Sequence, residues 1–289
     1  MLSKGLFVNY LVVLTLFCVS FVYADALQLM YDPFNDSERD TQNLPSSAKW
    51  YTRSDSSTLF VNTGVANYRI ETSVSAGNQF WAHFTESGSP VNLQVGESID
   101  FTFNALMPVA SDGSWDRTLW FGLFNSNGTR DAADGSGVGA ARTDDTGYFV
   151  ITNPGVNSIN RSTVNKVTPS TASDHFVHYT NMANTSSWPM QAEAQYQVGL
   201  TVARTGESEI TLSGRTGPSN YTFSGIVDSS DVYSVFDTIS FYYDGRGFPG
   251  DTGAIAADYV TVVYNQIPEP ATFVLLAAMV PFFRKTRKQ

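Results

Sequence analysis

The sequence has only one cysteine in 289 residues, Cys18. It lies in an apolar N-terminal stretch, so the chain beyond that stretch can form neither a disulfide nor a thiolate metal site. The body of the chain also lacks helical periodicity, a Gly-x-Ser-x-Gly nucleophile elbow and a phosphate-binding Gly-Lys-Ser/Thr loop. These absences argue against a thiol enzyme, an elbow-type serine hydrolase and a P-loop nucleotide enzyme.

Positive charge is scarce between residues 25 and 266. The whole chain has 17 Lys and Arg residues, and 12 of them lie in this range, because Lys4 and four cations of the tail lie outside it. Of the 27 Asp and Glu residues 26 lie in this range, because only Glu269 lies outside it. The net charge of the range is therefore −14. Nucleic-acid binding needs a basic surface, and this composition argues against it. It also argues against adhesion to anionic lipid, and it is compatible with divalent cations as partners.

The last 22 residues consist of three parts: Pro268-Glu269-Pro270, an apolar run from Ala271 to Phe283, and the cations Arg284, Lys285, Arg287 and Lys288. A helix of thirteen residues is about 20 Å long, whereas the hydrocarbon core of a bilayer is about 30 Å thick. The run is therefore marginal as a permanent span, and the cations favour its cytoplasmic end. A buried C-terminal element is the alternative, although four cations in five residues do not normally follow one.

Residues 1–24 have the layout of a secretory signal peptide. Lys4 precedes an apolar stretch from Leu6 to Val22, and Val22-Tyr23-Ala24 places small residues before a cut at Asp25. An uncleaved N-terminal anchor is the alternative.

Together the two ends resemble those of proteins with a PEP-CTERM sorting signal, on the three parts of residues 268–289. The resemblance implies export by a Gram-negative type of bacterium and recognition of the tail by an exosortase-like membrane enzyme. It also implies transient anchoring in the inner membrane by a hydrophobic sorting helix, and association with the cell envelope or extracellular polysaccharide. We therefore predict a signal peptide at 1–24, an exported domain at 25–266 and a sorting signal at 267–289.

Short runs rich in β-branched and aromatic residues predict β-strands throughout residues 25–266. The run SIDFTFNAL (98–106) alternates apolar with polar residues, which indicates one buried and one wet face. The run RTLWFGLFNS (117–126) is almost continuously apolar and predicts a strand that is covered on both faces or lies inside a sandwich. Further strands are predicted at 195–204, 207–214, 237–244 and 257–265, with a hairpin turn near Gly206.

More than ten such strands in about 240 residues predict one all-β domain, a two-sheet antiparallel jelly-roll sandwich. Two weakly patterned stretches, 131–146 and 164–193, are predicted to be long loops on one rim. The strand content and order resemble concanavalin A-like and laminin-G-like jelly rolls. The phrases that carry this resemblance are NLPSSAKWY (43–51), LWFGLFNSNGT (119–129), DDTGYFV (144–150) and FDTISFYYDG (236–245), the last leading into ADYVTVVYN (257–265). The fold implies a carbohydrate-related role but does not establish one.

Sugar binding needs exposed aromatic rings beside polar groups, because rings stack on the C–H faces of a pyranose while its hydroxyls need hydrogen bonds. Trp115 and Trp188 lie in the polar loop sequences SDGSWDR and NTSSWPM, and we predict that they contact the sugar together with Tyr179 and Arg142. Loop packing is the alternative for both tryptophans. The other three, Trp50, Trp81 and Trp120, lie in apolar strand contexts and are expected in the core.

Calcium takes six to eight oxygen ligands, which the loops of a β-sandwich can supply. In related jelly rolls the first and last strands lie side by side, so we predict a structural Ca²⁺ shared by Asp32 and Asp258. The alternative is that Asp32 caps a turn and Asp258 pairs with backbone or with Arg39. A second acidic group, formed by Asp131, Asp134, Asp144 and Asp145, is expected in a solvated loop.

The histidines are His83, His175 and His178. The two that lie three residues apart, His175 and His178, are interpreted as rim residues, because a His-based metal site needs a third ligand.

No strand carries the alternating carboxylates that glycoside hydrolases of this fold use, and Glu207-Ser208-Glu209 is interpreted as a solvated strand end. The sequence thus predicts a secreted, non-catalytic envelope or matrix protein that binds polysaccharide. A glycan-active hydrolase or lyase and a purely structural surface protein are the alternatives.

Overall fold

The computed structural model describes residues 26–40, 44–53, 58–62, 69–72, 78–106, 118–131, 133–135, 144–152, 162–168, 175–176, 178–186, 194–244 and 256–267. The chain divides into a compact unit, Leu27–Tyr264, and a second unit made of both ends, Met1–Ala26 and Asn265–Gln289. The predicted signal peptide and the motif residues 268–289 lie outside the described residues. In the described part of the chain, no helix has the length and apolar character needed to span a membrane.

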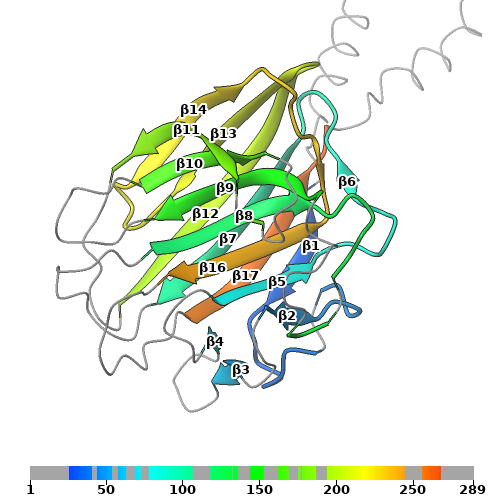
Figure 1. Ribbon diagram of the computed structural model, residues 1–289, viewed down its shortest axis with the longest axis vertical. Coiled ribbons are helices and arrows are strands. Elements are labelled where there is room, and N and C mark those ends of the chain that lie inside the picture. Colours follow the sequence, from blue (N-terminus) through cyan, green and yellow to red (C-terminus); the bar gives the residue numbers. More distant parts are fainter. Residues whose placement is uncertain are drawn as a thin grey trace, which may run out of the picture. The chain divides into compact units, whose positions relative to one another are not determined.

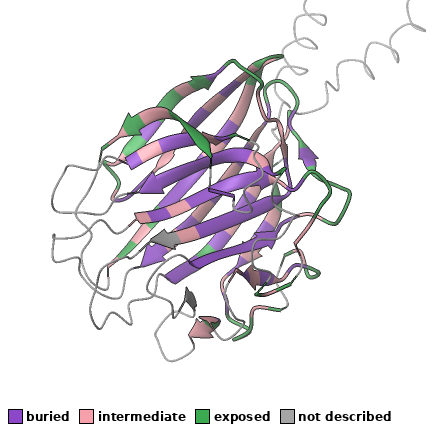
Figure 2. Cartoon of the chain, in the orientation of Figure 1, coloured by how far each residue is buried: buried purple, intermediate pink, exposed green. Residues whose placement is uncertain are grey.

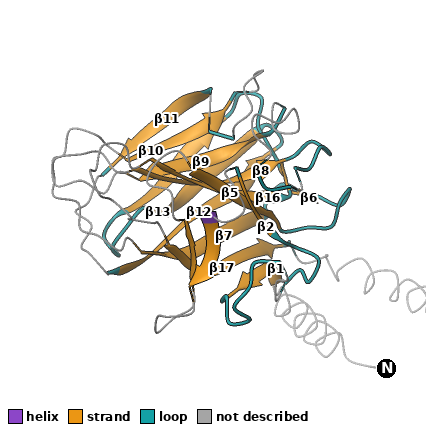
Figure 3. Cartoon of the chain, turned by 60° about the horizontal axis from the view of Figure 1, so that its bottom comes forward, coloured by secondary structure: helices purple, strands orange, loops and turns teal. Residues whose placement is uncertain are grey.

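The described body is an all-β sandwich of two antiparallel sheets, as the alternating sequence pattern predicts, and Figures 1 and 3 show the two layers of strands. The larger, eight-stranded sheet consists, in spatial order, of β14 (Thr222–Asp228), β13 (Glu209–Arg215), β12 (Gln195–Gly206), β7 (Ser98–Leu106), β17 (Ala256–Asn265), β4 (Arg69–Thr72) and β3 (Leu59–Asn62), with β1 (Ala26–Asp32) also paired to β17.

The seven-stranded sheet has the order β11 (Tyr179–Thr185), β10 (Ser162–Val167), β9 (Thr146–Thr152), β8 (Thr118–Asn125), β16 (Thr238–Asp244), β5 (Asn78–His83) and β2 (Trp50–Thr52). A small ribbon pairs β15 (Val235–Phe236) with β6 (Val91–Asn92). Strands distant in sequence are neighbours in both sheets, such as β8 with β16 and β7 with β17, which is the connectivity of a jelly roll.

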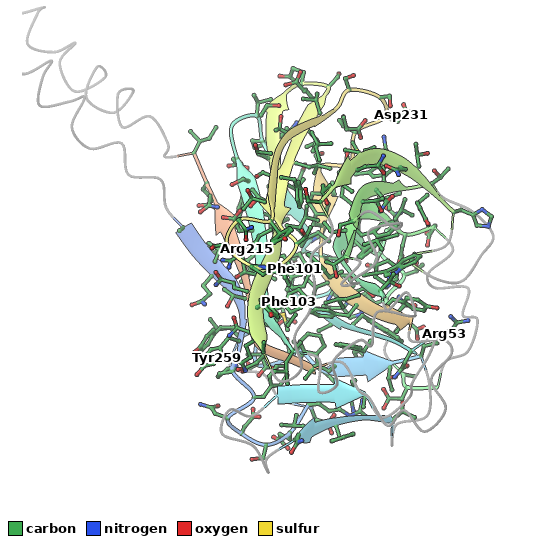
Figure 4. All side chains as sticks on the ribbon, turned by 90° about the vertical axis from the view of Figure 1, so that its left-hand side faces the viewer. Arg53, Phe101, Phe103, Arg215, Asp231 and Tyr259 are labelled. Carbon is green, nitrogen blue, oxygen red and sulfur yellow. The ribbon has the colours of Figure 1, made fainter. Side chains whose placement is uncertain are left out.

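The core lies between the sheets and is built from every second residue of the facing strands. Ile99, Phe101 and Phe103 of β7 are fully buried there, and Phe101 and Phe103 appear in the side-chain layer in Figure 4. Phe103 packs edge-on against Phe241 of β16, with ring centroids 4.7 Å apart. Figure 2 shows the same pattern, with buried residues concentrated in the central strands. The strands predicted at 98–106 and at 195–265 are confirmed, with small differences at their ends.

The long loop predicted at 164–193 is wrong, because β10 ends within it and β11 lies wholly inside it. The strand β11 is hard to recognise because only Tyr179, Met182 and Ala183 interrupt its polar residues. It is an edge strand whose residues are mostly exposed or half-buried, so burial imposes little apolar alternation on its sequence.

The outer face of the seven-stranded sheet carries a second apolar cluster, which consists of Phe124, Phe149, Ile151, Val167 and Phe176. Two glycines make room for it. At Gly122 a Cβ would lie 2.5 Å from both Phe149 Cβ and the carbonyl oxygen of Tyr148, and at Gly147 it would lie 2.2 Å from the carbonyl oxygen of Leu123. Strand β8 is therefore covered on both faces, as its continuous apolar run predicts.

Gly122→Ala is expected to lower the free energy of unfolding by about 1–3 kcal/mol, because the added methyl group overpacks the contact between β8 and β9. Gly206→Ala is the matched control, since its Cβ would meet only Glu209 Cβ, at 3.2 Å, at the end of a hairpin. We expect little change there. Urea unfolding followed by fluorescence measures both, and equal losses would contradict the role given to Gly122.

Candidate functional site

A group of aromatic rings lies on the outer face of the seven-stranded sheet, and we call Trp120, Phe149, Phe176, Tyr179 and Tyr242 the ring cluster. Trp120 stacks on Phe149 with ring centroids 5.8 Å apart, and it meets Tyr179 at 5.8 Å and Tyr242 at 5.3 Å. The indole N–H of Trp120 donates to Thr118 Oγ1 at 2.8 Å, which fixes the ring. Tyr179 is the most accessible member, at 41% exposure, while Trp120 and Tyr242 are half-buried.

Amide side chains border the ring cluster along the edge strand β11. Asn181 and Asn184 are both exposed, and Asn181 Nδ2 donates to Asn184 Oδ1 at 3.1 Å. Asn181 pairs in register with Asn165 of β10, which is fully buried and donates to Thr163 Oγ1 at 2.9 Å. We call the ring cluster with Asn181 and Asn184 the ring-and-amide surface. It combines an exposed ring with donors and acceptors, the combination that sugar binding requires.

A buried histidine holds Phe176 of the ring cluster against the sheet. His175 is 2% exposed, stacks on Phe124 with centroids 4.6 Å apart, and contacts Asp145 Oδ2 through Nε2 at 2.5 Å. Its Nδ1 lies 3.0 Å from Ser240 Oγ and also contacts Gln79. Burial raises the pKa of Asp145, and the adjacent His175 opposes this rise. The segment that carries Phe176 is thus fastened to β5, β9 and β16.

The order Ser240, His175, Asp145 resembles that of a nucleophilic triad, but its surroundings do not suit catalysis. Ser240 is completely buried and its hydroxyl also contacts Gln79 and the Phe80 carbonyl oxygen. A nucleophile needs access to its substrate. The three side chains therefore stabilise the packing of the loop on the sheet.

The turn after β8 is held by Asp237, which is buried where β15 joins β16. Asp237 accepts hydrogen bonds from the backbone N–H of Ser126 at 2.9 Å and from its hydroxyl at 2.5 Å, and it lies 3.4 Å from Arg130 Nη2.

His83 contacts Thr238 Oγ1 at 2.7 Å. Burial and the nearby Arg130 lower the pKa of His83 to about 4, so it is neutral at physiological pH.

The four aspartates of the predicted acidic group take separate roles and do not converge on a metal. Asp134 forms a bidentate ion pair with Arg39, at 3.1 and 2.5 Å, and accepts a hydrogen bond from the backbone N–H of Thr52. Burial alone would raise the pKa of Asp134, but these bonds lower it below its ordinary value. Asp145 contacts His175, Asp144 accepts from Thr129 Oγ1 at 3.1 Å, and the carbonyl oxygen of Asp131 accepts from Trp81 Nε1 at 3.0 Å. Within the described ranges, no group of three His, Cys, Asp or Glu side chains could hold a metal ion.

The first and last strands, β1 and β17, are paired, and both carry a buried aspartate. Asp32 accepts from Phe34 N at 2.8 Å through Oδ1 and from Trp50 Nε1 at 2.7 Å through Oδ2. Asp258 accepts a hydrogen bond from the backbone N–H of Tyr259 at 2.8 Å. The strand is irregular here, as in a β-bulge, because Tyr259 has a φ of 49° and both Ala257 and Val260 face the core. Burial raises the pKa of Asp32 to about 7, and the charges of Asp36 and Asp258 add to the rise.

This geometry bears on the Ca²⁺ predicted at Asp32 and Asp258. Both oxygens of Asp32 already accept hydrogen bonds, and its raised pKa means that it holds a proton more readily than an ordinary carboxyl group. Each oxygen keeps a second lone pair, so a cation can bind there only if Asp32 loses its proton, and it has to find most of its six to eight oxygens elsewhere.

Of the predicted sugar contacts, only Tyr179 is among the described residues; Trp115, Trp188 and Arg142 lie outside them. Trp50 is in the core between the sheets as predicted. Trp81 is also fully buried as predicted, but on the outer side of its sheet, because it alternates with Phe80. Trp120 is only half-buried on the same outer side, because it alternates with Phe121. The interpretation of His175 as a rim residue is wrong, since it is buried under the loop, whereas His178 is exposed. Sequence reasoning missed Tyr242, whose only signal is the alternation of β16. It also missed Asn181 and Asn184, which lie in a strand without apolar alternation.

No family model and no curated protein matches the sequence. Solved structures do match the fold. The metal-free Emp46p carbohydrate recognition domain is 10% identical and has a TM-score of 0.50, over 81% of this chain and 94% of that chain. The VIP36 exoplasmic/lumenal domain in its Ca²⁺/Man3GlcNAc-bound form is 10% identical with a TM-score of 0.46, over 84% and 89% of the two chains. Lectin II from Ulex europaeus is 11% identical with a TM-score of 0.45, over 84% and 100%.

The chain therefore has the jelly-roll sandwich fold of legume-lectin-like domains. At 10% identity the likeness concerns the fold alone.

Asp32→Asn is expected to change the pH dependence of stability. The pKa of Asp32 is raised from 3.8 to about 7 in the folded state, so the folded state binds this proton more tightly than the unfolded state. The stability that the bound proton gives to the folded state is fully present below pH 3.8. It is lost as the pH rises toward 7. Relative to wild type, the Asn variant should gain up to about 4 kcal/mol between pH 4 and pH 8.

Urea unfolding at several pH values measures this difference, with Glu207→Gln as the control, because the Glu207 side chain is 93% exposed between β12 and β13. A constant difference across the range would contradict the raised pKa. Repeating the series with Ca²⁺ and with a chelator tests the predicted ion. A Ca²⁺-dependent gain that Asp32→Asn abolishes would support it.

Proposed function

We propose that this protein is an exported, non-catalytic, glycan-binding protein of the cell envelope or extracellular matrix. The observation that carries the proposal is the ring-and-amide surface, where the exposed ring of Tyr179 lies in a fixed aromatic cluster beside exposed amides. The lectin-like fold supports the same class of function without identifying a sugar. A Ca²⁺ at Asp32 and Asp258 remains a prediction.

The proposed route to the envelope rests on the two ends of the sequence. The signal peptide directs export, and an exosortase-like membrane enzyme recognises Pro268-Glu269-Pro270 with the apolar segment and the basic tail. The C-terminal segment holds the protein in the inner membrane until it is processed, and the body then reaches the outer surface or the matrix.

Two alternatives keep the same fold. A hydrolase or lyase would release new chain ends from the glycan, and a purely structural protein would assemble without any glycan. The carboxylates described near the outer face contact cations, histidine or backbone groups, as Asp134, Asp145 and Asp237 do, and this favours binding over catalysis.

Tyr179→Ala is expected to weaken binding of the host's extracellular polysaccharide about two- to tenfold, because one ring contact contributes about 0.5–1.5 kcal/mol. Titration calorimetry on the purified full-length protein measures the loss. Tyr259→Ala is the matched control, since Tyr259 is similarly exposed, at 45%, but belongs to the other sheet. If wild type binds none of the host's polysaccharides, the binding function is wrong and the structural alternative gains support.

Replacing Pro268-Glu269-Pro270 by three alanines is expected to leave unprocessed protein in the inner-membrane fraction, because the processing enzyme no longer recognises the tail. Immunoblotting of fractionated host cells measures the shift in size and location. Tyr259→Ala, which leaves the tail unchanged, should be processed like wild type. Normal processing of the triple-alanine variant would contradict the predicted sorting signal.

A further inference from the structure

Four of the five strands that carry the ring-and-amide surface are nearly free of charge. Across β8, β9, β10 and β11 the only charged residue is Lys166, and the fifth strand, β16, ends at Asp244. This is unusual in a chain that carries 44 charged side chains, 17 basic and 27 acidic. The surface therefore meets a ligand with rings, hydroxyls and amides.

Lys166 does not serve this surface, because it points into the sandwich. Its Nζ lies 2.8 Å from Asp228 Oδ2 and 4.8 Å from the centroid of the Tyr233 ring, and it also contacts the Ser230 carbonyl oxygen. Its side chain is 13% exposed. The cation that these four strands contain is thus committed to a buried contact on the opposite face of the sheet.

The polar groups of the surface follow one line along β11. Tyr179, Asn181 and Asn184 are exposed on the outer side. A bulge lies between them, so the segment from Tyr179 to Asn184 spans the four steps from Val167 to Thr163 of β10, about 13 Å of strand. That length exceeds a single sugar ring. Amides donate to and accept from hydroxyl groups, and a neutral amide offers a carboxylate no compensating charge.

We infer that the ring-and-amide surface binds an extended, uncharged glycan chain along β11 and discriminates against uronate and other anionic polysaccharides. This inference rests on the proposed function and specifies its ligand class. An anionic chain would be repelled by the net negative protein, and its carboxylates would lose water at the surface without gaining a cation from the described residues of β8 to β11, where Lys166 is held inside the sandwich.

The test compares neutral oligosaccharides of several linkages with the same oligosaccharides oxidised at C6 to uronates, on the purified full-length protein. We expect neutral chains to bind at least about tenfold more tightly at low salt, with the gap narrowing as salt screens the repulsion. Tyr179→Ala should weaken the binding of the neutral chains. Equal or tighter binding of the oxidised chains overturns this inference and leaves glycan binding intact, whereas binding of neither kind overturns both.

A charge insertion provides the second arm. Asn184→Lys places a cation on the surface and should raise the affinity for oxidised chains about tenfold, while neutral chains bind more weakly because the Asn184 amide is lost. Gln28→Lys is the matched control, because Gln28 is exposed on β1 of the other sheet. An equal gain in both variants would mean that net charge alone controls binding, and it would overturn the assignment to β11.

Discussion

The close approach of β8 and β9 is the constraint on which the outer surface of the seven-stranded sheet depends. Gly122 and Gly147 alone allow it, because a Cβ at either position would meet backbone of the neighbouring strand at 2.5 Å or less. The space above the glycines is filled by Phe149 and Phe124. Trp120 then stacks on Phe149, and His175 stacks on Phe124. The ring cluster and the loop that carries Phe176 are built on these two contacts.

Loops around this surface are fixed without a disulfide, by buried polar groups that satisfy one another. Asp145 contacts His175, Asp237 binds Ser126 and Arg130, and Asp134 binds Arg39. Removing one member of such a pair leaves the other buried and unsatisfied, which costs more than the pair contributes. These pairs therefore make the arrangement of the loops specific. They also use carboxylates that a catalytic or metal site would need.

The sequence predicts the sandwich well, because strands buried on one face alternate and those buried on both faces are continuously apolar, as 98–106 and 117–126 show. It predicts the surface less well. The alternation of β5 indicates that Phe80 and Trp81 point to opposite faces of the sheet. It does not indicate that Trp81, on the outer face, is fully buried. Tyr179 was found through its ring, whereas β11 as a strand was missed because its polar residues satisfy no apolar period. The contact of His175 with Asp145, thirty residues earlier in the chain, leaves no sequence signal.

Charge is distributed so that, under the proposed function, ligand recognition acts at short range. Asp134, Asp237 and Asp145 are held in contacts with Arg39, Arg130 and His175, and the cation of β10 lies inside the sandwich. A net charge of −10 keeps the chain soluble and repels anionic polymers over a Debye length. Attraction must then come from contact, through ring faces and amide hydrogen bonds whose strength changes little with salt. Under the proposed function this arrangement gives selectivity for uncharged chains, because long-range attraction to polyanions is suppressed.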